Sequence, residues 1–402
     1  MKSPVISPDL VVFLAGVTAA LHIGKVPPAL PALESSLGVT LIQAGFLLSL
    51  VQMAGMSFGL LIGSSAESLG LRRSMVTGLI ILCITSVLSS LAKTPSPLLW
   101  LRGFEGIGFL LVAMPAPALI RRLVNTSLLH RRLGLWGCYM GMGTGLALFF
   151  GPWIISATSW QGWWLGLAAI TSVVCICVTV TVPADETSHL SCDQNPSPGQ
   201  EKLDWITRLK LTLSTPGPWL IAAIFAAYSS QWIAVIGFLP STYIEAGLEG
   251  SLVGALTAAV AFINILGNFS AGQLLHRGFR AQNLLYTGFI VMSLGTYLTF
   301  STVVNDWFLV RYLAVLSFSA VGGMIPAALF SLSVHLAPNE QTISTTVGWM
   351  QQWSSLGQFF GAPIVAFLAD AVGGWQYTWA VTLLLSFLGV LLSSHSAIRK
   401  VF

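Results

Sequence analysis

The stretch WQGWW at residues 160–164 is nearly repeated as WQYTW at residues 375–379. The matching Trp and Gln residues of the two stretches are 215 positions apart, a little over half of the 402-residue chain. Five further matches occur in the same order along the chain, at offsets of 209 to 211. They pair Leu30-Pro31 with Leu239-Pro240, Gly63 with Gly272, Arg102 with Arg311, Pro115 with Pro326 and Phe149-Phe150-Gly151 with Phe359-Phe360-Gly361. This regular spacing predicts two homologous halves.

Composition places the chain in a lipid bilayer. Hydrophobic residues make up 55% of it and charged residues only 8%, against a charged share of about 25% in soluble domains. Apolar runs of about 18 residues or more recur along its whole length, which is typical of membrane-spanning helices. We therefore expect an all-α, multi-pass membrane protein. We expect no enzyme, because neither half contains a set of nucleophile, base and acid.

Hydropathy, interrupted at Pro, Gly and charged residues, predicts twelve spans, six in each half. They cover residues 9–31, 41–65, 74–92, 97–120, 133–156, 162–182, 218–244, 251–275, 283–303, 307–335, 343–369 and 377–396. The predicted organisation is an N-terminal six-helix half at 1–182, a cytoplasmic linker at 183–217 and a C-terminal six-helix half at 218–402. The linker is rich in Pro, Ser and Asp, and its EKLDWITRLK stretch predicts a short amphipathic surface helix.

Basic residues predict the orientation, because positive charge is retained on the cytoplasmic side of a membrane. With the N-terminus inside, fourteen of the 18 Lys and Arg residues lie in cytoplasmic segments, and only Lys93 lies in an outer loop. Both termini are therefore expected in the cytoplasm. The net charge of +4 reflects this topology and does not indicate a nucleic-acid partner. The repeated Trp stretches then begin at outer span ends, where we interpret them as headgroup-level anchors.

Two loops and one span carry motifs of a known family. GSSAESLGLRR at 63–73 resembles the G-x-L-A-D-R-x-G-R-R/K loop of the major facilitator superfamily, and GQLLHRGFR at 272–280 resembles its second-half copy. RGFEGIG at 102–108 resembles the R-x-x-Q-G-x-G pattern of the superfamily's fourth span. The resemblance implies a cytoplasmic gate that is asymmetric, since His276 replaces the loop acid of the second copy. The gate residues it assigns are Gly63, Glu67, Gly70, Arg72, Gly272 and Arg277.

Within the superfamily the chain is most similar to the cyanate/nitroimidazole-type transporter family. The similarity rests on GKVPPALPALESSLGVTLIQAGFLLSL at 24–50 and WLRGFEGIGFLLVAMPAPALIRRL at 100–123. Members of that family carry an Arg-Pro pair in the first span, where this chain has Ala20-Leu21. The resemblance implies a monomeric transporter in the inner membrane of a bacterium.

Four charged side chains fall inside predicted spans: Lys25, Arg102, Glu105 and Arg311. A charge within the membrane is costly and indicates a functional site. The superfamily resemblance implies that spans 1, 4, 7 and 10 line a central cavity, where Lys25, Arg102 and Arg311 would bind an anion. Two alternatives to anion binding remain open. In the first, Lys25 and Arg311 extend to the outer headgroups. In the second, Arg102 and Glu105 form a structural pair.

Glu105 is the leading candidate for proton coupling, because it is the only acid well inside a span. His22 is the next, since imidazole titrates near neutral pH, although a hydrogen bond across helices would also explain it. Gln231 corresponds to His22 at the repeat offset of 209. With His22, the uncharged substrate-binding candidates are Gln231, Gln351 and Trp353, and lipid-facing packing is the alternative for Trp353.

The predicted function is secondary-active transport of a small anionic solute by alternating access, as proton-linked uptake (symport). Efflux of drugs or metabolites is the runner-up, because Gly151-Pro152 resembles a motif of the superfamily's antiporters. A membrane sensor that keeps the fold without transport is the third hypothesis. The five cysteines lack the partners of a metal site, so we expect no metal and no cofactor. The expected partners are the solute, a proton and the lipid bilayer.

Overall fold

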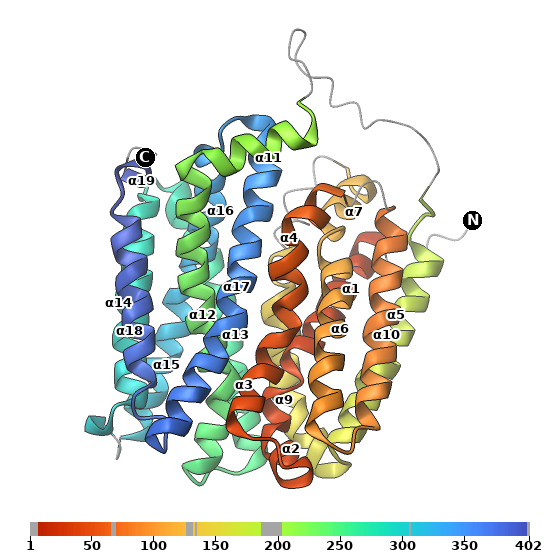
Figure 1. Cartoon of the computed structure of the whole chain (residues 1–402), viewed down its shortest axis with the longest axis vertical. Coiled ribbons are helices and arrows are strands. Elements are labelled where there is room, and N and C mark those ends of the chain that lie inside the picture. The colour runs from red at the N-terminus through yellow and green to blue at the C-terminus, as the bar shows by residue number, and fades with distance from the viewer. Residues whose placement is uncertain are drawn as a thin grey trace.

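The computed structural model describes residues 7–65, 70–125, 132, 135–185, 203–304 and 307–399. Within these ranges every regular element is a helix, and no strand is present. Figure 1 shows two bundles side by side, one coloured red to yellow and the other green to blue. The expected all-α class is confirmed.

The first bundle comprises the helices before residue 182, and two of its spans are broken by short 3₁₀ segments. Its elements are α1 (Pro8–Gly24), η1 (Pro27–Ala29), α2 (Leu30–Leu37), α3 (Leu41–Ser49), η2 (Leu50–Gln52), α4 (Met53–Ser65), α5 (Leu71–Ser90), α6 (Pro95–Ala113), α7 (Ala116–Leu123), α9 (Tyr139–Ala157) and α10 (Trp160–Thr181). The α1 break has a sequence cause. Pro27 and Pro28 lack the N–H groups that would continue its hydrogen bonds.

A short amphipathic helix, α11 (Trp205–Ser214), lies in the stretch where the linker was expected to form one, and the second bundle follows it. The elements of this bundle are α12 (Pro216–Glu245), α13 (Gly250–His276), α14 (Ala281–Phe300), η3 (Thr302–Val304), α15 (Phe308–Gly322), α16 (Met324–Leu336), η4 (Glu340–Thr342), α17 (Ile343–Val372), α18 (Thr378–Ser393) and α19 (Ser396–Arg399). Asp204 caps α11 by accepting a hydrogen bond of 3.2 Å from the Thr207 amide, which satisfies a donor that the helix leaves free.

Eleven helical stretches among the described residues are long and apolar enough to cross a membrane. They coincide with the first eleven predicted spans. The twelfth prediction falls on α18, an apolar helix of only 16 residues. The chain is therefore a multi-pass integral membrane protein.

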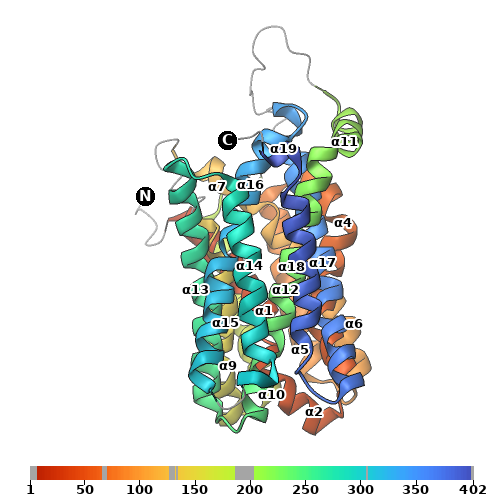
Figure 2. The same ribbon diagram turned by 90° about the vertical axis from the view of Figure 1, so that its left-hand side faces the viewer.

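The two bundles meet along three pairs of helices and are sealed together at one end. Helix α17 packs on α3 and α4, and α13 packs on α9. At the end where α2 lies, buried residues of both halves form one apolar cluster, in which Leu48 and Phe238 take part. Figures 1 and 2 show α11 and α19 at the opposite end, here called the α11 end.

The Trp residues of WQGWW do not anchor the protein at a lipid surface, so that interpretation is wrong for the first copy. Trp160, Trp163 and Trp164 are each only 3% exposed. The indole of Trp163 donates a hydrogen bond of 3.2 Å to the Lys25 carbonyl. Trp164 lies against the Lys25 ammonium, 4.9 Å from the ring centroid. Trp163 and Trp164 thus face inward toward polar partners inside the bundle, and Trp160 packs edge-on against Trp164, with centroids 5.5 Å apart.

Candidate functional site

A cavity of about 1440 Å³ lies between the two halves. Its lining runs from Ile23 on α1 and Gln52 on η2 toward α7, α11 and the end of α13. Beyond Ile23 and Gln52, toward α2, the apolar cluster closes the space between the bundles. The cavity therefore opens at the α11 end and is shut at the other.

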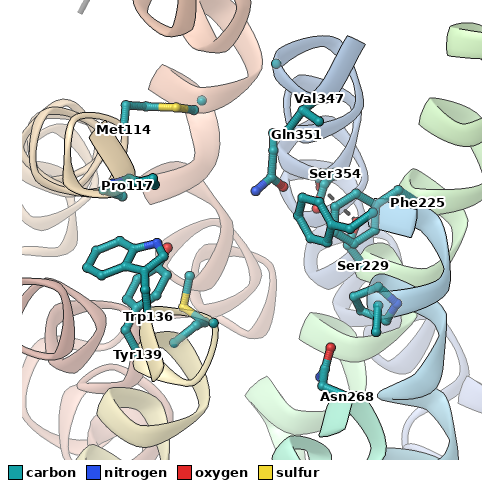
Figure 3. A pocket seen from close by; sticks show the side chains of 18 of the residues that line it. Met114, Pro117, Trp136, Tyr139, Phe225, Ser229, Asn268, Val347, Gln351 and Ser354 are labelled. Carbon is teal, nitrogen blue, oxygen red and sulfur yellow. Dashed lines mark hydrogen bonds between the residues drawn. The ribbon is translucent and has the colours of Figure 1, made fainter. Parts of the chain in front are cut away.

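The two long walls of the cavity differ in chemistry, as Figure 3 shows. The first half contributes Met114 and Pro117 together with Trp136 and Tyr139, whose rings stack with centroids 4.2 Å apart. Trp136 can lie against α1 only because Gly16 has no side chain there; a Cβ at Gly16 would be 2.3 Å from its ring. The first-half wall is mainly apolar and aromatic.

The second half supplies most of the polar lining. Gln351 extends into the cavity from α17, and Ser354 lies one turn further along the same helix. The Ser229 hydroxyl donates to the Ser354 carbonyl at 2.9 Å, which joins α12 to α17. Across the boundary between the halves, the Gln52 amide donates to the Gln358 side chain at 3.0 Å.

Charge in the lining has one sign. Among the described residues that line the cavity there are three arginines and no Asp or Glu. The arginines are Arg121 on α7, Arg208 on α11 and Arg277 at the end of α13, beside His276. All lie toward the open end, so a solute entering there meets a positive field.

A second polar centre is sealed inside the first half. The Glu105 carboxylate pairs with the Lys25 ammonium through one oxygen and with the Arg102 guanidinium through the other, the second pair at 2.7 Å. All three side chains are at most 2% exposed. Two cations and one carboxylate leave a surplus of one positive charge. None of the three lines the cavity, although Ile23, next in the chain to His22, does.

Hydrogen bonding defines the protonation of this cluster. The Thr171 hydroxyl donates to the Leu167 carbonyl at 2.7 Å, so it accepts from His22 Nε2, 2.8 Å away. His22 Nδ1 is then an acceptor and faces the Lys25 ammonium at 3.4 Å. Ser86 and Glu105 are the other two acceptors of that ammonium. Three acceptors match the three donors of a charged lysine, and His22 is neutral.

Arg102 joins the two spans whose helices are broken. Its Nη2 donates to the Ile23 carbonyl at 3.1 Å, and its Nε donates to the Leu47 carbonyl at 2.9 Å. A continuous α-helix would pair Ile23 with the amide of residue 27, which is proline and has none. The guanidinium thus satisfies a carbonyl that the sequence leaves without its usual partner.

Known proteins with similar sequences and structures agree with this architecture. The profile of the Major Facilitator Superfamily matches residues 11–361. The chain belongs to this superfamily. It is 28% identical over 277 residues to the cyanate transport protein CynX of Escherichia coli K12, an alignment covering 66% of this chain and 65% of that protein. It is 25% identical over 255 residues to the uncharacterized MFS-type transporter Rv1877 of Mycobacterium tuberculosis H37Rv, covering 63% and 34%. The alignments thus span less than two thirds of either relative.

Solved structures of the superfamily have the same fold. A bacterial homologue of the human lysosomal transporter Spinster, in an inward-facing and unoccupied conformation, matches with a TM-score of 0.76 and 16% identity, covering 98% of this chain and 95% of that one. The inward-facing and occupied form of that homologue matches with the same TM-score and 14% identity, covering 98% and 96%. At these identities the likeness concerns the fold alone.

The predicted site residues do not lie together in one site. Lys25, Arg102, Glu105 and His22 form the sealed cluster, in which Arg102 and Glu105 are paired, as one of the two alternatives left open by the sequence had it. Gln351 is the predicted solute contact that lines the cavity. Trp353 lies outside the lining and packs edge-on against Trp219, with centroids 5.6 Å apart.

The two remaining candidates, both in the second half, also lie away from the cavity lining. Gln231 is buried and accepts a hydrogen bond of 2.8 Å from Ser386. This pair matches His22 and Thr171 of the first half, and Ser386 follows Thr171 by 215 positions, the offset of the Trp stretches. Arg311 donates to the Thr299 carbonyl at 2.7 Å, between α15 and α14.

The loops with the superfamily motifs lie at the α11 end. Glu67 is outside the described residues, and Gly63 is in the last turns of α4. Gly70 is the N-cap residue before α5 and has a φ of 82°, a conformation that favours glycine, and the carboxylate of Asp185 accepts from the amides of Arg72 and Arg73 at 3.1 and 2.8 Å. In the second half, Gly272 and Arg277 line the cavity opening.

Sequence reasoning did not find Asp185 or the aromatic pair of Trp136 and Tyr139. Asp185 lies in the predicted linker, 113 positions from Arg72, and an acid in a polar linker has no distinguishing signal. The Trp136 and Tyr139 pair is in an apolar stretch that hydropathy assigns to span 5. A spacing of three residues, which puts both rings on one helix face, was the available signal.

Proposed function

We propose that this protein is a secondary-active transporter that moves a small anionic solute by alternating access. The observation that carries the proposal is the single sign of charge in the cavity: its charged lining residues, among those described, are all arginines. The sealed cluster behind Ile23 adds one more positive charge. A cation would be repelled by both, whereas an anion is attracted from the opening inward.

Alternating access is supported by the shape of the cavity. It is open at the α11 end and closed at the other by an apolar cluster contributed by both halves. In transporters built from two repeats, the halves rock about a site between them. We propose that the loops containing Glu67 and Arg277 close the α11 end in the opposite state. If Glu67→Gln left both the transport rate and the balance of states unchanged, this role for the loops would be wrong.

We propose twelve spans with both termini in the cytoplasm of a bacterial cell, in its inner membrane, and a monomer as the transporting unit. The excess of Lys and Arg in segments on one side supports this orientation. Helix α18 would be the twelfth span, and 1–182, 183–217 and 218–402 would be the two halves and their linker. The α11 end is then cytoplasmic and the structure is open to the inside.

The solute class is also supported by a relative. The E. coli protein that aligns at 28% identity is a cyanate transport protein, and cyanate is a small monovalent anion. The alignment covers 65% of that protein. We propose that this chain shares the class of solute, a monovalent anion, and that Lys25 and Arg102 act on it through their field. Gln351 would contact it directly.

Proton coupling is proposed for the sealed cluster. In this conformation Glu105 balances two cations, so protonating it would leave two buried positive charges without a counter-charge, which is costly. A proton on Glu105 therefore requires a state in which Lys25 or Arg102 has another partner. A neutral His22 beside the Lys25 ammonium is the other acceptor available to a proton in the cluster.

Efflux of larger amphipathic solutes is the second candidate, and one observation favours it. The cavity volume of about 1440 Å³ exceeds the roughly 300–1,000 Å³ of ordinary small-molecule pockets, and aromatic rings are part of both of its walls. The arginines at its opening argue against cationic drugs as its solutes. A sensor without transport would keep the same cavity, and only a flux measurement separates it from a transporter.

The test uses the full chain in liposomes, with uptake of cyanate, nitrate and formate measured with and without an inside-alkaline gradient. We expect saturable uptake that the gradient increases. Arg121→Gln with Arg277→Gln should slow uptake about tenfold at low salt and less at high salt, since steering is screened by ions. The matched control is Lys93→Gln, outside the cavity lining. Outward movement of drug cations with no anion flux would favour efflux, and no flux of any solute would favour the sensor.

A further inference from the structure

The donors on the second-half wall point to the chemical group that binds there. Tyr228 accepts a hydrogen bond of 3.2 Å from Asn264, so its own O–H proton is left for a ligand. The indole N–H of Trp232 is buried and has no hydrogen-bond partner among the described residues. Tyr228 and Trp232 are one turn apart on α12 and share a face. Both line the cavity.

Helix α17 brings further donors beside them. Gln351 extends its amide into the cavity (Figure 3). The Ser354 hydroxyl is close to Gln358 Nε2, at 3.4 Å, and acts there as the acceptor, so its proton is also available. Because α12 and α17 pack together and Ser229 bonds the Ser354 carbonyl, these groups form one donor-rich surface. A carboxylate has two oxygens with about four acceptor sites, which this surface matches.

The opposite wall, from the first half, is suited to binding an aromatic ring. Trp136 and Tyr139 stack nearly parallel, at 17°, and form a flat aromatic platform, and Met114 lies further along the same wall, beyond Pro117 (Figure 3). Aromatic rings bind other rings by offset stacking or edge contacts, and a methionine sulfur adds a favourable contact with a ring. An ion as small as cyanate could touch only one of the two walls at a time.

The number of charges on the ligand follows from the sealed cluster. Behind Ile23, Lys25 and Arg102 exceed Glu105 by one positive charge. The arginines of the lining lie at the open end and remain in water there. The cluster therefore offers one counter-charge, across the cavity from the donors of the second half, to a ligand held deep in the cavity, and a second negative charge would be buried without one, which is costly.

We propose, building on the anion transport proposed above, that the cavity binds an aromatic monocarboxylate. Its ring lies on the platform of Trp136 and Tyr139, and its carboxylate accepts from Tyr228, Trp232 and Gln351. The proposal assigns a separate role to each wall: the first half selects a flat apolar body, and the second half selects the anionic head.

The test measures binding of radiolabelled benzoate to the purified full chain in detergent, where passive leak of benzoic acid has no effect. Unlabelled benzoate should displace the label at about a tenfold lower concentration than cyanate, benzamide or the dianion phthalate. Cyanate lacks the ring, benzamide lacks the charge, and phthalate has one charge too many. Equal displacement by cyanate or benzamide would overturn the proposal.

Single variants test the contribution of each wall on its own. Trp136→Ala should weaken benzoate about tenfold and leave cyanate unchanged, whereas Tyr228→Phe should weaken both. The matched controls are Trp100→Ala and Tyr377→Phe, whose side chains are 71% and 49% exposed. If Trp136→Ala does not fold, Met114→Ala tests the same wall. A benzoate affinity that neither wall changes would contradict the proposal.

Failure of this inference is distinguishable from failure of the proposed function. Saturable cyanate uptake into liposomes, together with no benzoate binding, would leave anion transport standing and remove the aromatic monocarboxylate. If no anion of either size binds or crosses, both are wrong.

Discussion

Arg102 donates from Nη2 to the carbonyl of Ile23 over 3.1 Å, and this is the carbonyl that Pro27 leaves without a helical partner. A proline pair in the first span would otherwise expose an unpaired backbone group inside the membrane, where no water can satisfy it. The arginine of the fourth span therefore keeps the first span stable at its break. Its depth in the membrane has a structural reason independent of any solute.

Arg102→Lys should destabilise the protein, because a lysine ammonium cannot reach Glu105 and the carbonyls of two other spans together. We expect a loss of about 2–4 kcal/mol in the free energy of unfolding, close to that of a broken buried pair, measured by denaturant unfolding in detergent. The control is Arg311→Lys, at the equivalent place in the second half, with a loss below about 1 kcal/mol. Equal losses in the two variants would contradict the role of Arg102 in holding the first and second spans to the fourth.

Glu105→Gln removes the only carboxylate of the sealed cluster and leaves two buried cations unpaired. The expected loss in the free energy of unfolding is about 3–5 kcal/mol. Adding Lys25→Met should recover part of that loss, since one cation is then gone and Arg102 keeps its carbonyl partners. Unfolding curves of both single variants and the double variant give the coupling energy. A double variant no more stable than Glu105→Gln would argue against the pair.

Gly106→Ala should separate the fourth span from the broken second span. A Cβ at Gly106 would lie 2.2 Å from the Val51 carbonyl oxygen, which is backbone and cannot turn away. We expect poor yield and early thermal unfolding in detergent. Gly166→Ala is the control, because an added Cβ meets nothing within 4 Å there. Normal stability of Gly106→Ala would mean that the two spans are further apart than described.

Closure at the α2 end can be tested by a disulfide between the halves. A Cβ on Gly45 would be 2.9 Å from that of Ala366, closer than the separation of about 3.5–4.5 Å in disulfides, so the two helices must move apart slightly when the bond forms. Oxidised Gly45Cys/Ala366Cys protein should hold the cavity open at the α11 end and stop transport, and a reducing agent should restore it. Loss of two free thiols by mass spectrometry checks the bond. Unchanged transport by the oxidised protein would show that this end does not open.

The all-α, multi-pass fold could be predicted from the sequence because hydropathy depends on many residues at once. The pairs Arg102 with Arg311 and WQGWW with WQYTW predict the two halves, and the first eleven apolar runs predict spans close to the observed helices. The pairing of Arg102 with Glu105 was also predictable, since a spacing of three residues puts both on one helix face.

The face on which each charge lies was not predictable. Depth in a span says how far Lys25 is from water but not whether it points to the cavity or into its own bundle. That choice depends on partners from three other helices, Ser86, Glu105 and Trp164. Trp163 and Trp164 of the first repeat copy were misinterpreted for the same reason, because an inward polar partner outweighs the general preference of Trp for the headgroups.

Lys25 and Glu105 have no charged copy in the second half, since the offset of 209 places Ala234 and Ala314 opposite them, whereas Arg102 corresponds to Arg311. In the alternating access proposed above, the cluster carries its one net positive charge with the first half. Carrying a unit charge through the whole membrane field is worth about 2.3 kcal/mol per 100 mV. A partial displacement of the cluster along the membrane normal is worth the same fraction, so we expect the membrane voltage to bias which side of the membrane the empty protein faces.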